Sequence, residues 1–128
     1  MIASSLLLGV AGLAASFGPA DLLAALNAPT VEPLPVLIQL LGALYLGSAF
    51  TNWIAKDNII GGIYSRPIAL GNNIHFVVGA LALLKYGFAQ GFGAPVVVAL
   101  MVYTIFAVCF MYLVFGLGAA CKVASRES

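Results

Sequence analysis

Residues 52–75 read NWIAKDNIIGGIYSRPIALGNNIH, and this stretch holds most of the polar side chains of an otherwise apolar chain. The 128 residues are 63% hydrophobic and 7% charged, with a mean hydropathy of +1.13, whereas soluble domains are roughly half apolar and a quarter charged. The composition therefore predicts an integral membrane protein with a single transmembrane domain, residues 1–128.

Long apolar segments lie on both sides of this polar stretch. Their lengths suit transmembrane helices of about 17–25 residues, and we predict spans at 2–18, 34–55, 68–86 and 96–119. The first segment has no Lys or Arg before it and no convincing cleavage site after it, so we interpret it as a retained helix. Pro19 either kinks this helix or opens a new short one, for which Asp21 suits the first turn. The expected fold is an all-α membrane bundle of four helices.

Small residues indicate how the spans pack. Ser5, Gly9, Gly12 and Ser16 recur at +4, +7 and +11, which places them on one helix face. Such a stripe lets a second helix approach closely. The second span carries a similar flank, made of Gly42, Ala43, Gly47, Ser48 and Ala49.

The charges predict the orientation in the membrane. Four spans put both termini on the same side as the loop 56–67, and this side carries four cations: Lys56, Arg66, Lys122 and Arg126. The opposite side has Lys85 against Asp21 and Glu32. The positive-inside rule therefore places the loop and both termini in the cytoplasm. Four residues are expected as interface anchors: Trp53 and Lys56 at one membrane boundary, Lys85 and Tyr86 at the other.

The polar residues of the third span have two interpretations. Asn72 and His75 share a helix face with Gly79, whereas Asn73 points about 100° away. With Asn52, and with Gln39 as a further member, they would form a polar pocket for a headgroup, an ion or the polar tip of a ligand. Alternatively, they hydrogen-bond to neighbouring helices, which contributes about 0.6–2 kcal/mol for each bond.

Arg66 also has two interpretations. Gly61 and Gly62 would let the loop fold back over the bundle and bring Arg66, fixed by Pro67, to an anionic headgroup or phosphate. The alternative is a plain topology signal, as for any lone arginine in a cytoplasmic loop. We predict Asn52, Arg66, Asn72 and His75 as the ligand-binding residues.

Several function classes lack the residues that they need. His75 is the only histidine, and Cys109 and Cys121 are twelve residues apart, so no metal site, bis-histidine haem or disulfide within that helix is expected. The four carboxylates fall in loops or tail, which leaves no paired-carboxylate site. A net charge of +1 without a basic cluster excludes nucleic acid as a partner. We predict no cofactor and no catalytic residue.

The four spans and the pattern Arg66-Pro67-x-x-x-Gly71 at the start of the third resemble small DoxX-like bacterial membrane proteins, over residues 36–86. That resemblance implies a location in the bacterial inner membrane. Some members of this set are described as partners of redox or stress-response proteins. This chain lacks the arginine that many of them carry in the first helix, and no catalytic residue carries over.

Three function hypotheses follow. The first is a non-enzymatic protein that acts by binding, either as an accessory subunit of a membrane complex or as the holder of a lipid-like ligand. The second is an oligomeric transporter or channel for small solutes, with a polar path near Asn52, Asn72 and His75. The third is an enzyme that acts on a lipid or quinone. Expected partners are membrane lipid and either further copies of the chain or other membrane subunits.

Overall fold

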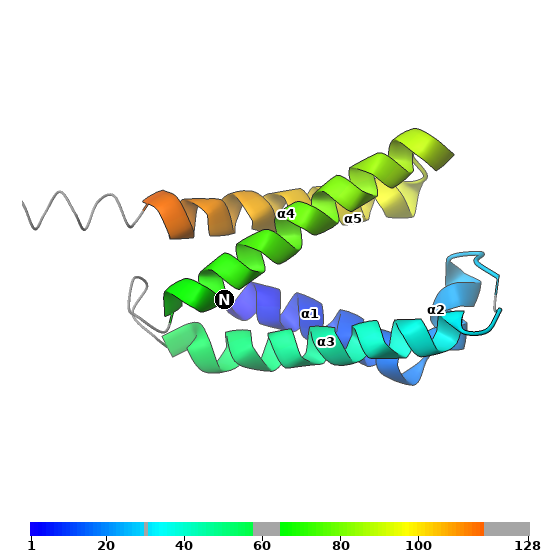
Figure 1. The fold of residues 1–128 in the computed structure, drawn as a ribbon, viewed down its shortest axis with the longest axis horizontal. Helices are drawn as coiled ribbons and strands as arrows, with labels where there is room; N and C mark the ends of the chain where they lie inside the picture. Colours follow the sequence, from blue (N-terminus) through cyan, green and yellow to red (C-terminus); the bar gives the residue numbers. More distant parts are fainter. Residues whose placement is uncertain (30, 58–64, 117–128) are drawn as a thin grey trace, which may run out of the picture. The chain divides into compact units, whose positions relative to one another are not determined.

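The computed structural model describes residues 1–29, 31–57 and 65–116, which form helices and turns and contain no strand (Figure 1). The helices are α1 (Ile2–Phe17), α2 (Pro19–Ala25), α3 (Leu34–Ile54), α4 (Ser65–Gln90) and α5 (Ala94–Met111). Ala55–Asp57 form a 3-10 turn, η1, and Tyr112–Gly116 form a π-helical turn, η2. The predicted all-α class is confirmed for these residues. Most of the predicted loop 56–67 and the tail with Cys121, Lys122 and Arg126 lie outside them.

Three helical segments are long and apolar enough to cross a membrane: Leu34–Asp57, Ser65–Gln90 and Ala94–Phe115. Large apolar side chains stay exposed along them, such as Leu44 at 69% and Val108 at 64%, as expected for surfaces that face lipid. The bent pair α1 and α2 gives a fourth candidate if it counts as one span. The chain is therefore consistent with an integral membrane protein, and the number of crossings stays a prediction.

Pro19 opens a new helix, the second of the two alternatives that the sequence left. α1 ends at Phe17, and the Gly18 N–H donates to the Ala14 carbonyl oxygen at 3.0 Å. α2 then starts at Pro19 with Asp21 in its first turn, and its axis is turned by 105° from that of α1. Proline suits this position because its missing N–H would have no partner in a first turn.

The later helices extend beyond the predicted spans. α4 starts at Ser65 where the sequence predicted 68, because Pro67 is tolerated in a first helical turn. It ends at Gln90 where the sequence predicted 86, before Gly91 with a φ of +96°. Gly87 therefore lies inside α4, although it falls between the predicted spans 68–86 and 96–119. A helix can project out of the hydrocarbon, so the membrane limits themselves stay predictions.

The chain divides into two compact units, residues 1–57 and 58–128, and each is described by itself. In the first unit α1 lies along α3 (Figure 1). A Cβ on Gly12 would lie 2.9 Å from the Gly42 carbonyl oxygen, and one on Gly42 would collide with Ser16. The two backbones approach this closely only because both positions are glycine. The stripe predicted on the first helix is thus confirmed as a packing face.

On α3 only part of the predicted flank packs. Gly42 and Ala49 are buried and seven residues apart, which is two helical turns, while Ala43, Gly47 and Ser48 are exposed. The prediction was wrong for these three because they lie off the stripe that runs through Gly42 and Ala49.

The second unit is built around Phe76 on α4, whose side chain is fully buried. Its ring stacks on Phe106 with centroids 4.8 Å apart and on Phe110 at 5.8 Å, and it meets Tyr103 edge-on at 5.3 Å. Gly79 makes room for Tyr103, since a Cβ there would collide with that ring. Aromatic packing therefore joins α4 to α5.

Candidate functional site

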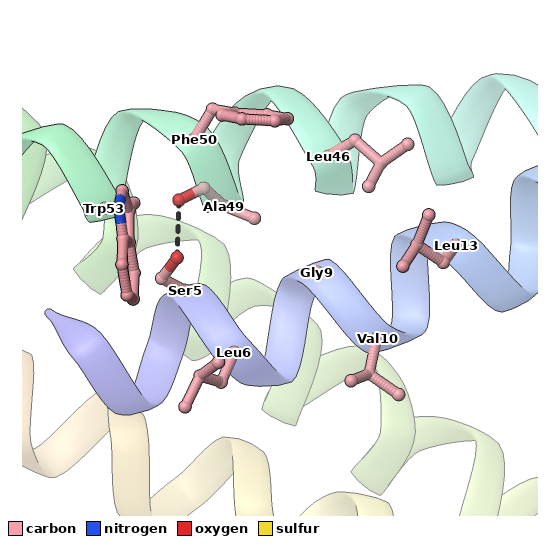
Figure 2. Close-up of a pocket in the computed structure, with 9 residues that line it drawn as sticks. All are labelled: Ser5, Leu6, Gly9, Val10, Leu13, Leu46, Ala49, Phe50 and Trp53. Carbon is pink, nitrogen blue, oxygen red and sulfur yellow. Dashed lines mark hydrogen bonds between the residues drawn. The ribbon is translucent and has the colours of Figure 1, made fainter.

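An open apolar groove of about 380 Å³ runs between α1 and α3 (Figure 2). Ligand pockets in proteins usually measure about 300–1,000 Å³. Five lining residues come from α1 and four from α3: Ser5, Leu6, Gly9, Val10 and Leu13, then Leu46, Ala49, Phe50 and Trp53. All of them belong to the first unit, so the groove lies within one compact body.

The groove exists because small residues face each other across the helix pair. A Cβ on Gly9 would stand 3.7 Å from the Ala49 Cβ, which is an ordinary van der Waals contact. Neither position carries a side chain large enough to fill the space beside this pair. Figure 2 shows Ser5 and Trp53 near one end and Leu13 and Leu46 towards the other. The first and last lining residues on α3, Leu46 and Trp53, are seven positions apart, or about 10 Å along the axis.

Polar side chains gather at the Trp53 end and bind one another. The Ser5 hydroxyl donates to the Ala49 carbonyl oxygen at 2.7 Å, and Asn52 Nδ2 donates to Ser4 Oγ at 3.3 Å. The Ser4 hydroxyl donates in turn to the Met1 carbonyl oxygen at 2.7 Å. Ser4, Ser5 and Asn52 are all buried. The contact of Asn52 agrees with the helix-packing interpretation of this amide, and its role in ligand binding stays a prediction.

Trp53 and Lys56 make the groove different from the rest of the apolar surface. The Lys56 ammonium nitrogen lies 3.9 Å from the centroid of the Trp53 ring, a distance at which a cation is attracted by the ring. Trp53 itself lines the groove and is 45% exposed. A cation and an indole therefore lie together at one end of the apolar groove, as in the interface anchors of membrane proteins.

The other predicted site residues lie on α4, in the second unit. Arg66 is exposed in the first turn. Asn72 is buried and its amide nitrogen donates to the Ile68 carbonyl oxygen at 2.9 Å, one turn back on the same helix. The His75 ring is 5.1 Å from that of Phe76 and 5.7 Å from that of Tyr103. Because Asn52 belongs to the first unit, the predicted pocket that joins it to Asn72 and His75 stays a prediction.

Asn73 is as well buried as Asn72, each at 7% exposure, although the two side chains point in different directions. Its Oδ1 atom has no hydrogen-bond partner among the described residues. The predicted anchors Lys85 and Tyr86 are both exposed near the end of α4. No group of three or more His, Cys, Asp or Glu side chains in the described ranges could hold a metal ion.

A second groove, of about 330 Å³, lies between α4 and α5. Thr104 is the one lining residue with a hydroxyl, which it donates to the Leu100 carbonyl oxygen at 2.7 Å. No charged side chain lines this groove. It resembles an ordinary lipid-facing surface, and the α1/α3 groove is the stronger candidate.

Sequence reasoning missed the groove and most of its lining. It placed Ser5 and Gly9 on a packing face and Trp53 at a membrane boundary. These two inferences would have located the groove only with the further knowledge that the first span packs against the second. A comparison with protein-family models, curated proteins and solved structures finds no match for this chain. The resemblance to DoxX-like proteins therefore stays a prediction.

Proposed function

We propose that this protein acts by binding and not by catalysis, and that the α1/α3 groove holds the acyl chain of a lipid-like ligand within the membrane. The chain would cross the membrane four times with both termini in the cytoplasm. A lipid-holding role suits either a subunit of a larger complex or a protein that works alone.

The groove is the observation that carries this proposal. The polar groups of its lining are the Ser5 hydroxyl, whose proton is already donated to Ala49, and the Trp53 indole N–H at the end that we assign to the headgroup. The rest of the lining is apolar, so an aliphatic chain enters it without covering an unpartnered polar group, whereas a polar solute would lose its hydration without replacement. This argument favours a lipid-like ligand over the small solutes of the transport hypothesis.

The orientation of the groove supports the same ligand. One end lies beside Trp53 and Lys56, which are residues typical of the headgroup level, and the other end lies about 10 Å deeper along α3. A membrane lipid likewise has a polar headgroup at one end and apolar acyl chains at the other. The groove can thus hold the upper part of an acyl chain while the headgroup stays at the interface.

Lipid analysis of the purified protein tests the proposal. The wild type, Gly9→Leu and Gly47→Leu are purified in mild detergent, and bound lipid per chain is measured by mass spectrometry. Gly9 lines the groove, so a leucine there is expected to occupy it, while position 47 has no atom within 4 Å of an added Cβ and lies on the exposed side of α3. We expect Gly9→Leu to lose lipid that the wild type and Gly47→Leu retain. Equal lipid content in all three proteins would contradict the proposal.

A further inference from the structure

We infer that the α1/α3 groove selects lipids with an anionic headgroup, and that Lys56 is the residue that selects them. This inference rests on the proposed function, because it names the class of lipid that the same groove takes. Its test is separate, since a groove can hold acyl chains without distinguishing their headgroups.

The Trp53 end of the groove presents donors to a headgroup. The Lys56 ammonium has three N–H donors and no acceptor, and the Trp53 indole has one N–H donor and no acceptor. The Ser5 hydroxyl proton is donated to Ala49, so it is not available to a ligand. A headgroup at this end therefore meets N–H groups and a positive charge, which suit the acceptor oxygens of a phosphodiester.

The charge of Lys56 distinguishes between headgroups that share this phosphodiester. An anionic lipid places a net negative charge near the ammonium nitrogen, whereas a zwitterionic lipid also carries an ammonium group that Lys56 repels. One lysine near an anionic headgroup is expected to favour it about fivefold. The Lys56 side chain is already held at this end of the groove, because its nitrogen lies 3.9 Å from the centroid of the Trp53 ring.

Asp57 is the charged neighbour that opposes this preference. It follows Lys56 in the 3-10 turn η1 and is exposed. In a turn of three residues per revolution its side chain points about 120° away from that of Lys56. Asp57 therefore weakens the field of Lys56 from a different direction, and its removal is expected to strengthen the preference.

The experiment uses Trp53 as its reporter, because it is the only tryptophan in the chain. The full chain is placed in phosphatidylcholine vesicles that contain increasing fractions of a lipid with brominated acyl chains. The brominated lipid is phosphatidylglycerol in one series and phosphatidylcholine in the other. Bromine quenches Trp53 fluorescence on contact, so the two curves give the relative affinity for the two headgroups. We expect about a fivefold preference for phosphatidylglycerol in the wild type.

Four variants locate the source of this preference. Lys56→Gln is expected to bring the ratio of the affinity for phosphatidylglycerol to the affinity for phosphatidylcholine close to one. Lys56→Arg should keep the wild-type ratio, and Asp57→Asn should raise it. Lys85→Gln, an exposed lysine on α4, is the matched control and should leave it unchanged.

A wild-type ratio of one would overturn the inference, as would a preference that survives in Lys56→Gln. If either occurs while Gly9→Leu still loses bound lipid, the groove binds acyl chains without distinguishing between their headgroups. If Gly9→Leu keeps its lipid and its quenching curve, the proposed function itself fails.

Discussion

The Ser5 hydroxyl on α1 donates a 2.7 Å hydrogen bond to the backbone carbonyl oxygen of Ala49 on α3, and both residues are buried (Figure 2). The two residues are 44 positions apart in the sequence. This bond joins the helices at the polar end of the groove and fixes the distance between its two walls. The groove is therefore part of a packed helix pair.

Ser5→Ala is expected to destabilise the helix pair. The bond lies in apolar surroundings, and interhelical hydrogen bonds in membrane proteins contribute about 0.6 kcal/mol on average and up to about 1.7 kcal/mol. The free energy of unfolding in mixed micelles should fall by an amount in this range. Ser48→Ala, on the exposed side of α3, should have little effect. Equal losses in both variants would show that the hydroxyl bond is not the cause.

Gly12→Val is expected to force the two helices apart. An added Cβ lies 2.9 Å from the Gly42 carbonyl oxygen and from the Leu46 backbone nitrogen, and backbone atoms cannot move aside like flexible side chains. Overpacking of this kind costs about 1–3 kcal/mol in the free energy of unfolding. Gly47→Val has the same change in helix propensity without the collision. Similar unfolding free energies for the two variants would contradict the close approach.

Phe76→Ala should remove the centre of the second unit. The ring contacts Tyr103, Phe106 and Phe110, and aromatic pairs contribute about 0.5–1.5 kcal/mol each beyond their buried area. We expect the free energy of unfolding to fall by at least about 1.5 kcal/mol. The control is Phe88→Ala on the same helix, whose ring is 76% exposed. A loss no larger than that of this control would rule out Phe76 as the core residue.

The proposed topology predicts opposite accessibility at the two ends of α3. In a background without Cys109 and Cys121, single cysteines replace Asn27 or Asp57, which are both exposed. A maleimide that does not cross membranes should label Asn27→Cys on intact cells and Asp57→Cys only after lysis. Labelling of both on intact cells would mean that α3 does not cross the membrane, and the reverse pattern would place the termini outside.

The sequence predicted the all-α class and the packing stripe on the first helix because both depend on composition and local spacing. The buried position of Phe76 could not be predicted, since apolar residues occur on every face of α4 and α5 and no polar face marks the opposite side. The position of Lys56 over Trp53 follows from η1, a short turn that the apolar pattern does not reveal. The groove could be predicted only by knowing which helix packs against Gly9, and local sequence patterns do not show which distant helices pack together.

Photo-crosslinking with a lipid that carries a diazirine on its acyl chain tests the central claim most directly. The crosslinked residues of the full chain in vesicles are mapped by peptide mass spectrometry. If the groove holds an acyl chain, adducts should concentrate at Leu46, which lines it and is only partly exposed, and exceed those at Leu40 and Leu44, which are 59% and 69% exposed elsewhere on α3. Adducts that follow exposure alone, with Leu44 labelled more than Leu46, would contradict the claim that the groove holds a lipid.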